Sequence, residues 1–480
     1  MAELARNTYV QFAARGIGTA LGVVAIALIT RTLGPEGFGA YTTVTSFLQI
    51  FGVLVDFGLT IVGLQLLSEP GADEGRVLGN VLGVRLVTAV TFLGLAPLAV
   101  LFFPYPQEVK IGVAFTTLSF LALAVHQIIT TLFQKRLQMR AAAAAELAGR
   151  AILVALVALA AWSGWGLYGM LAATTAANVL QLAVAWIAAN RMVPIRIRYE
   201  LAFWKRILTL SWPIGVSIAF NLIYLRADAV ILSLTRSQEE LGLYGAAYRV
   251  IDVLTVLPFL LMGLVLPRLV TAVKTGDVAR FGALMARSAR FLLASILPVC
   301  FGGLVLADQI MIAVSGEAFA PSGMFLAVLL FGVAMIFWGT VYSHAVVALE
   351  LQRTMLPFYA LNAALALALY VWLIPRLGAP AAAWITVLSE TTIAVAAAVV
   401  VRRKMPVPLP LGNAARIVLA AALMAATLWL VLRAVPLPLV VSLPLGGLLY
   451  AAFLRLSGGL TADDWRAILA PFSRNKPVVS

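Results

Sequence analysis

Residues 31–41 read RTLGPEGFGAY and lie between two long apolar segments. A similar stretch, TRSQEELGLYGAAY, follows at residues 235–248. Three residues of the first stretch recur in the second at one constant offset: Glu36, Gly39 and Tyr41 correspond to Glu239, Gly242 and Tyr244. A short polar loop that recurs between apolar segments indicates a membrane protein built from two copies of one unit.

The composition of the chain excludes a soluble domain. Of its 480 residues, 62% are hydrophobic and 11% are charged, whereas a soluble domain has about 25% charged residues. Apolar runs of about 20 residues recur along most of the sequence, and each is long enough to cross the ~30 Å hydrocarbon core of a bilayer. We therefore predict an all-α polytopic membrane protein.

The apolar runs define about fourteen transmembrane helices. The offset between the two loops places the first pair of spans over the seventh and eighth, which predicts two six-helix bundles related by a pseudo-twofold axis along the membrane normal, plus two extra C-terminal helices. The predicted spans are residues 10–30, 42–67, 78–103, 111–134, 146–165, 167–190, 209–233, 243–270, 285–314, 322–348, 356–375, 380–401, 414–433 and 437–456. The predicted domains are an N-lobe (1–200), a C-lobe (201–403), the two further helices (404–457) and a cytoplasmic tail (458–480).

The distribution of positive charge predicts the orientation. Most Lys and Arg residues fall in loops on one side of the predicted spans. We therefore predict a multi-pass protein of the cytoplasmic membrane with both termini in the cytoplasm. The net charge of +14 then reflects topology and attraction to anionic lipid, not nucleic acid. The basic stretch at residues 191–206 is the predicted link between the lobes, with an amphipathic helix at the cytoplasmic surface.

Few residue types that support catalysis or metal binding are present. A single cysteine, Cys300, excludes an intrachain disulfide and a cysteine-based metal cluster, and two histidines leave little for a zinc site. The sequence contains no convincing Walker A motif and no Ser-His-Asp arrangement. We expect no enzymatic activity and no cofactor, apart from a coupling ion, H⁺ or Na⁺.

Polar side chains recur at helical spacing inside four of the predicted spans, namely the first, second, seventh and eighth. Ionisable groups within a span normally face protein or water, so these polar stripes predict a water-filled cavity between the lobes. The predicted cavity residues are Gln11, Arg15, Gln49, Asn221, Tyr224, Arg226 and Arg249. The predicted ion-coupling residues are Asp56, Asp228, Asp252 and Glu390.

A structural role remains open for each of these groups. Arg15 and Asp56, or Arg226 and Asp228, can neutralise one another within the bundle. Arg249 and Asp252 can pair on one helix face, and neighbouring hydroxyls can hold Glu390 neutral. Arg226 falls about 180° from the polar stripe of its own span. Arg85 and Arg150 lie near the cytoplasmic ends of their predicted spans, where we expect them to snorkel to the interface.

Several motifs resemble the polysaccharide-transporter branch of the multidrug/oligosaccharidyl-lipid/polysaccharide (MOP) flippase superfamily. In the first half these are RTLGPEGFGAY at 31–41 and DFGL at 56–59; in the second half they are YLRADAVIL at 224–232 and ELGLYGAAYR at 240–249. The resemblance covers about residues 1–403. Arg226, two positions before Asp228 in the RAD passage, departs from the family pattern, in which an uncharged residue is frequent.

The resemblance implies a V-shaped, MATE-like transporter that works by alternating access. Such proteins move polyprenyl-pyrophosphate-linked oligosaccharides, the repeat units of polysaccharide or O-antigen type, across the cytoplasmic membrane. It implies that Arg15, Arg226 and Arg249 are cavity cations and that Asp56 and Asp228 are the family's carboxylates. It also implies a lipid-linked oligosaccharide and membrane lipids as partners, with a glycan polymerase or glycosyltransferases as further ones. Nothing in the sequence calls for nucleic acid, and a monomer is sufficient for a two-lobe cavity.

Two other functions fit the same superfamily: a cation-coupled multidrug exporter and a flippase for peptidoglycan precursors of the lipid II type. A third alternative is a scaffold that recruits glycan enzymes without transporting anything. Drug exporters usually have twelve spans, and a cavity rich in Arg is unfavourable for cationic drugs.

The opening stretch itself reads as an architectural loop. Gly34 and Pro35 are expected to break the first helix, and Gly37 and Gly39 to permit a tight turn into the second. Tyr41 is expected to anchor the second helix at the membrane interface. The WSGWG sequence at 162–166 predicts a tight hairpin between the fifth and sixth spans.

Overall fold

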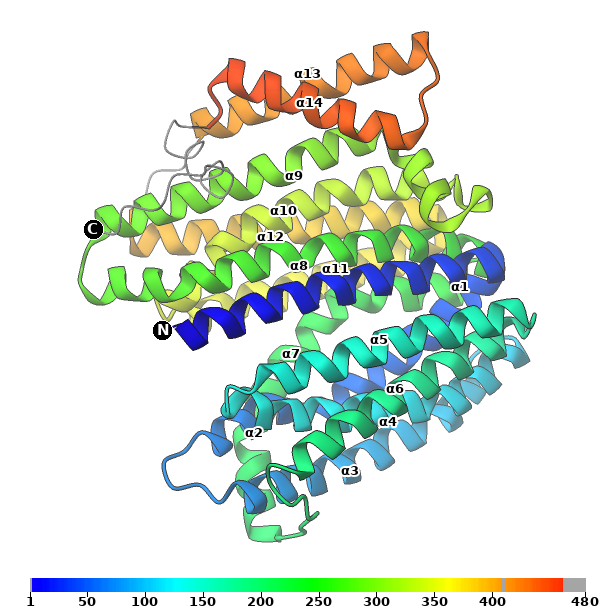
Figure 1. Cartoon of the computed structure of the whole chain (residues 1–480), viewed down its shortest axis with the longest axis vertical. Helices are drawn as coiled ribbons and strands as arrows, with labels where there is room; N and C mark the ends of the chain where they lie inside the picture. The colour runs from blue at the N-terminus through cyan, green and yellow to red at the C-terminus, as the bar shows by residue number, and fades with distance from the viewer. Residues whose placement is uncertain (1, 407–410, 461–480) are drawn as a thin grey trace. The chain divides into compact units, whose positions relative to one another are not determined.

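The chain folds as a set of long helices (Figure 1). The computed structural model describes residues 2–406 and 411–460, and of these residues 2–15, 217, 219–225 and 411–412 by their backbone alone. The helices are α1 (Ala2–Asp56), α2 (Leu59–Leu67), α3 (Glu74–Ala99), α4 (Gln107–Lys135), α5 (Met139–Trp162), α6 (Gly166–Asn190), α7 (Leu201–Thr235), α8 (Gln238–Lys274), α9 (Val278–Ser315), α10 (Ser322–Ala348), α11 (Gln352–Leu377), α12 (Ala379–Lys404), α13 (Leu411–Ala434) and α14 (Leu439–Ser457), with short 3₁₀ turns η1 (Val100–Phe102) and η2 (Glu317–Phe319).

The helices account for each of the predicted spans. Helix α1 runs for 55 residues, about 80 Å at the usual rise, which is far more than one crossing needs. Its backbone leaves helical geometry at Gly34 (φ 66°, ψ 179°), directly before Pro35. The predicted break is therefore confirmed, and α1 contains the first span and most of the second. Twelve helical segments of the described residues are long and apolar enough to cross a membrane, and the predicted seventh span lies within α7.

The first compact unit contains α1 to α7 and the first residues of α8. Its core is a continuous cluster of buried aliphatic and aromatic side chains from α2, α3, α4 and α6, among them Leu66, Leu82, Ile128 and Phe133. Helices α5 and α6 form the predicted tight hairpin, with Gly164 and Gly166 at positive φ in its turn. Residues 314–319 and 363–382 also belong to this unit.

The second compact unit contains the rest of α8 and α9, most of α10 to α12, and the C-terminal pair α13 and α14. The C-terminal pair forms a hairpin beside α9 (Figure 1). Tyr450 of α14 donates a hydrogen bond to the carbonyl of Ala294 in α9 (2.9 Å), and Gly302 of α9 faces Met424 of α13. The predicted lobes, 1–200 and 201–403, have different boundaries from these units and stay a prediction, and residues 461–480 of the predicted tail lie outside the described residues.

The two copies of the quoted stretch meet at their backbones. A Cβ on Gly39 would overlap the carbonyl oxygen of Gln238, and a Cβ on Gly242 would overlap the carbonyl oxygen of Pro35. Gln238 occupies the position in the second copy that Pro35 has in the first, just as Gly242 corresponds to Gly39. The two contacts are therefore one contact made twice, as a twofold axis requires.

A third contact marks the axis itself. The position of a Cβ on Gly245 lies 3.0 Å from the hydroxyl oxygen of Thr42, and Gly245 is the counterpart of Thr42 in the second copy. A residue that faces its own counterpart lies on the axis of an isologous contact. Thr43 extends the contact by donating a hydrogen bond to the side-chain oxygen of Gln238 (2.8 Å). The two copies of the repeated stretch thus pack against each other.

One detail of the predicted loop is wrong. Gly39 lies within helical backbone, so it is needed for close approach and not for the turn. Tyr41 and Tyr244 are 5% and 1% exposed, so both rings are enclosed by protein, and the anchoring of Tyr41 at the membrane interface stays a prediction. The phenol of Tyr41 lies 3.3 Å from the Thr174 hydroxyl, which holds α1 to α6.

The predicted amphipathic surface helix is also absent from residues 191–200, which contain a short turn followed by extended backbone. Helix begins only at Leu201, as the first turn of α7. Pro194 has no N–H to give to a helix, and the N–H of Arg198 bonds the carbonyl of Gly79 in α3 (3.1 Å). Residues 191–200 therefore bond to α3 and do not form hydrogen bonds of a helix of their own.

We expect Gly39→Ala to destabilise the protein, because a methyl group has no room against the Gln238 carbonyl. Overpacking of this kind costs about 1–3 kcal/mol. The measurement is the midpoint of thermal unfolding in detergent. Gly263→Ala in α8 is the matched control, since a Cβ there meets nothing within 4 Å. Equal midpoints for the two variants would contradict the backbone contact.

Candidate transport site

Four of the predicted cavity residues fall on side chains that lie outside the described ones: Gln11 and Arg15 of α1, and Asn221 and Tyr224 of α7. The other three, Gln49 of α1, Arg226 of α7 and Arg249 of α8, are partly buried. The prediction that these seven residues share one cavity therefore stays a prediction. What the structure adds is the local environment of the charged groups around them.

The second span is broken in its middle. Helix α1 ends at Asp56 and α2 begins at Leu59, and the residues between, Phe57 and Gly58, have positive φ of 34° and 83°. This conformation is unusual for a phenylalanine. Broken helices at membrane depth occur where protein or a cavity surrounds the freed backbone groups. We therefore expect protein or a cavity to surround the freed backbone groups at this break.

The break packs directly on α7. A Cβ at Gly58 would lie 2.9 Å from the Ser211 carbonyl oxygen, and one at Gly215 would lie 2.5 Å from the Phe57 ring. Ser211 and Gly215 lie on either side of Pro213, which interrupts the hydrogen bonds of α7. Two helix irregularities thus face each other, and glycines allow their close contact.

Asp56 closes the break by an ion pair with Arg85 of α3. The hydroxyl of Thr60 donates to the same carboxylate oxygen (2.5 Å), and Nη2 of Arg85 also donates to that hydroxyl (2.7 Å). The Arg85 side chain is 0% exposed, while that of Asp56 is 20% exposed. The three groups form a small network in which the charges of Asp56 and Arg85 cancel.

This network corrects two expectations. Arg85 does not snorkel to an interface, because it lies nearly halfway along α3 with its guanidinium enclosed in protein. Asp56 has Arg85 as its partner in the described part of the chain, where the sequence suggested Arg15. Nε and Nη1 of Arg85 are buried without a hydrogen-bond partner among the described residues. A neutralised carboxylate favours a structural role for Asp56, and its role in ion coupling stays a prediction.

Asp228 of α7 is held by its neighbours in the first unit. Tyr244 of α8 donates a hydrogen bond to its Oδ2 (2.5 Å), and the backbone N–H of Ala229 donates to its Oδ1 (2.7 Å). Asp228 is 1% exposed. The tyrosine of the second repeat stretch therefore orients the carboxylate that the sequence singled out. The constant offset between Tyr41 and Tyr244 pointed to this tyrosine, although not to its partner.

Two further carboxylates lie in the second unit. Arg249 and Asp252 form the ion pair that their spacing predicted, at 3.7 Å, with side chains 29% and 34% exposed. Glu390 of α12 is partly buried. The hydroxyl beside it, on Ser389, accepts a hydrogen bond from the Asn362 amide of α11 (2.7 Å). The buried Asn362–Ser389 pair joins α11 to α12 at the level of Glu390.

With this geometry established, comparison with known proteins identifies the family. Residues 4–272 match the family model described as polysaccharide biosynthesis protein. The chain belongs to this family. No curated protein matches it.

Solved structures share its fold. One titled lipid II flippase MurJ in an inward closed conformation superposes with a TM-score of 0.76 at 12% identity, covering 98% of this chain and 99% of that one. An inward-facing multidrug resistance transporter of the MATE family has a TM-score of 0.68 at 13% identity, covering 83% and 98%. A MOP-superfamily transporter from Pyrococcus furiosus has a TM-score of 0.57 at 13% identity, covering 84% and 95%. The predicted MATE-like fold is confirmed, and the protein is a multi-pass membrane protein.

We expect Arg85→Ala to destabilise the first unit severely, because it leaves Asp56 without its partner at the helix break. Removing one partner of a buried ion pair costs about 3–5 kcal/mol. The double variant Asp56→Ala/Arg85→Ala should recover part of this loss, since no uncompensated charge remains. Unfolding midpoints in detergent measure both effects. A double variant less stable than Arg85→Ala would show that the two charges do not act as a pair.

Proposed function

We propose that the protein is a flippase that moves polyprenyl-pyrophosphate-linked oligosaccharide across the cytoplasmic membrane by alternating access. Family membership supports a role in polysaccharide synthesis. One observation favours a lipid-linked substrate over a drug: the likeness to the lipid II flippase extends over 98% of this chain, whereas the likeness to the MATE transporter covers 83%. The C-terminal pair α13 and α14, beyond the predicted twelve-span repeat, is attached to α9 through Tyr450.

In this proposal the two hairpins that meet at Gly39 and Gly242 close one side of the transport pathway. Their contact is made by backbone against backbone and is centred on a twofold axis, so a small rotation of the two halves opens it symmetrically. Both termini lie in the cytoplasm, as the charge distribution predicts. The hairpins then face outward, and the substrate enters from the opposite, cytoplasmic side.

Arginine is the residue suited to the substrate head group. Its guanidinium keeps its charge and matches the geometry of phosphate oxygens. Arg15, Arg226 and Arg249 are the proposed contacts for the pyrophosphate. Arg85 is not among them, because its guanidinium is enclosed and bound to Asp56. A monomer provides all of these groups, and no nucleic acid is involved. Glycosyltransferases or a glycan polymerase are proposed as neighbours that make or use the cargo.

Transport in liposomes tests this function. Purified protein is reconstituted with a fluorescent polyprenyl-pyrophosphate sugar, and an impermeant quencher measures how much of it reaches the other leaflet. We expect rapid movement with the wild type and a loss of most activity with Arg15→Ala. Arg140→Ala, an exposed arginine at the start of α5, is the matched control. Export of ethidium under an ion gradient, without movement of the lipid, would favour the drug exporter.

Ion coupling is tested in the same liposomes. Asp228, Asp252 and Glu390 are the proposed coupling residues, and Asp228 is the one whose surroundings are best defined. We expect Asp228→Asn to change the pH or sodium dependence of transport, because an amide cannot exchange a proton or balance a cation. Tyr244→Phe, which keeps the carboxylate and removes its phenol partner, should shift the same profile less. An unchanged profile for Asp228→Asn would remove this residue as a coupling site.

A further inference from the structure

The segment between α6 and α7 is bound to α3 along its extended part. We call residues 191–200 the strap. A Cβ on Gly79 of α3 would overlap the carbonyl oxygen of Arg196, and a Cβ on Gly83 would overlap the carbonyl oxygen of Arg198. The two glycines are one helical turn apart, so they form a groove without side chains on α3. The strap backbone fills this groove.

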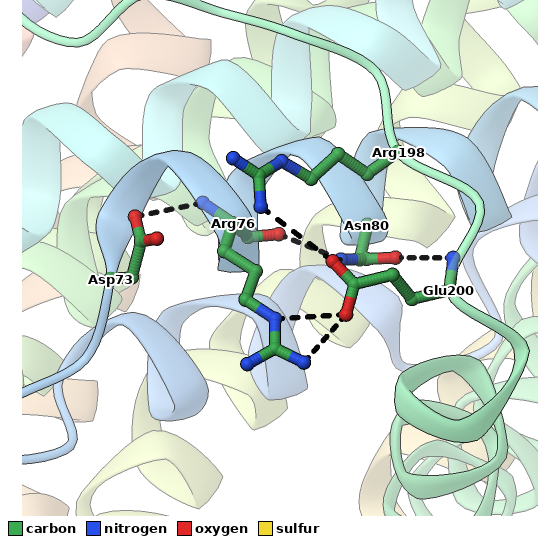
Figure 2. Close-up of polar contacts among 5 residues, drawn as sticks. All are labelled: Asp73, Arg76, Asn80, Arg198 and Glu200. Atoms are coloured by element: carbon green, nitrogen blue, oxygen red, sulfur yellow. Dashed lines mark hydrogen bonds and ion pairs between the residues drawn. The ribbon is translucent and has the colours of Figure 1, made fainter.

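Glu200 fastens the end of the strap, as Figure 2 shows. Its Oε2 accepts hydrogen bonds from Nε and Nη2 of Arg76 (2.8 and 2.6 Å). Its Oε1 accepts one from the buried amide of Asn80 (3.1 Å), and its own N–H donates to the Asn80 side-chain oxygen (3.0 Å). Arg198 adds a longer ion pair at 3.7 Å. Arg76 is fixed in turn, because its N–H donates to Asp73 at the start of α3 (3.0 Å).

The fastening persists at neutral pH. Hydrogen bonds from Arg76, and then from Asn80, lower the pKa of Glu200 below its usual value. A carboxylate with a lowered pKa stabilises the folded arrangement at neutral pH and loses this contribution as the pH falls through the lowered pKa. Glu200 is also the residue directly before α7, and its carbonyl accepts the N–H of Trp204 in the first turn of that helix (2.9 Å).

Further contacts fix the strap and the start of α7 on the same bundle. Arg206 of α7 pairs with Glu69 after α2 (2.7 Å). At the other end, the Arg136 guanidinium at the end of α4 donates to the Met192 carbonyl (3.3 Å), and the Ile195 N–H donates to the Asn190 side chain (2.8 Å). Contacts from α3, α4 and α6 therefore converge on the ten residues of the strap, and one contact from Glu69 holds the start of α7.

We propose that Arg76, Asn80 and Glu200 are positioning residues that keep the first turns of α7 attached to α3 throughout transport. Helix α7 is the first helix of the second repeat, yet its first turns move together with α3 of the first repeat. Bending of α7 during the cycle then takes place beyond the strap, at Pro213, where the helix hydrogen bonds are interrupted. This inference rests on the proposed function for its role in transport, while the attachment itself can be tested without any substrate.

The attachment is tested by trypsin. Cleavage after Arg196 or Arg198 requires the strap to leave the groove, because their carbonyl groups lie against α3. We expect Glu200→Gln to be cut about tenfold faster than the wild type, the factor that accompanies loss of a charge-assisted hydrogen bond. Gly83→Ala should act in the same direction. Gly94→Ala on the same helix is the control, since a Cβ there meets nothing within 4 Å. Equal cleavage of all four proteins would overturn the attachment.

The role in transport is tested by locking the strap. A Cβ on Gly75 would lie 3.6 Å from a methyl group of Val193, so Gly75→Cys/Val193→Cys in a Cys300→Ser background can be joined by a short bis-methanethiosulfonate, which forms a reducible disulfide with each thiol. We expect the joined protein to transport at more than half the rate of the same protein before joining. Transport that stops on joining and returns on reduction would show that the strap must lift, which overturns the proposal. Failure of the pair to react would contradict the docked geometry.

The two experiments separate this inference from the proposed function. If no lipid-linked sugar is moved by any form of the protein, the flippase function fails, while the trypsin result still decides whether Glu200 fastens the strap. The charge exchange Arg76→Glu/Glu200→Arg provides a rescue: it should restore the slow cleavage after Arg196 and Arg198 that each single change abolishes. Mass spectrometry of the fragments separates these two cuts from cleavage at the new arginine. Fast cleavage of the exchanged protein would show that the ion pair is not the fastening contact.

Discussion

The contact between the two glycine hairpins is the constraint on which the arrangement of the first unit depends. Gly39 and Gly242 bring two backbones so close that neither position has room for a Cβ. Because the contacts are related by the offset of the repeat, each copy supplies the surface that the other requires. The backbone contact gives a physical reason why Gly39 and Gly242, which correspond in the two copies, cannot be exchanged for a residue with a side chain.

The two carboxylates that the sequence singled out in the first unit follow a second rule: each is bound by a neighbouring side chain. Asp56 is bound by Arg85 and Thr60, and Asp228 by Tyr244. The Asp56 network lies at the break between α1 and α2, whereas Asp228 lies within α7 and is bound from α8. Arg85 is enclosed in protein and bound to Asp56, so the pyrophosphate contacts of the proposed mechanism are assigned to other arginines.

Much of the fold could be predicted from the sequence, because hydrophobic length and local breakers determine it. The spans follow from apolar runs, the break of α1 from Gly34 and Pro35, and the α5–α6 hairpin from its glycines. The partners of Arg85 and Tyr244 could not be predicted, since they depend on which helix faces which. The strap escaped prediction for the same reason: its extended form is set by the glycine groove of α3 and by Glu200, which lie far apart in sequence. The cavity residues stay a prediction, because four of the seven lie on side chains outside the described ones.

In the proposed mechanism the paired hairpins part and close as the protein transports its cargo. Glu36 and Glu239 are exposed counterparts on the two hairpins, so spin labels on Glu36→Cys/Glu239→Cys, in a Cys300→Ser background, report the gap between them by double electron–electron resonance in nanodiscs. We expect one short distance in the resting protein and a second, longer distance when a polyprenyl-pyrophosphate sugar is added. A single unchanged distance in a preparation that transports this lipid would contradict this mechanism.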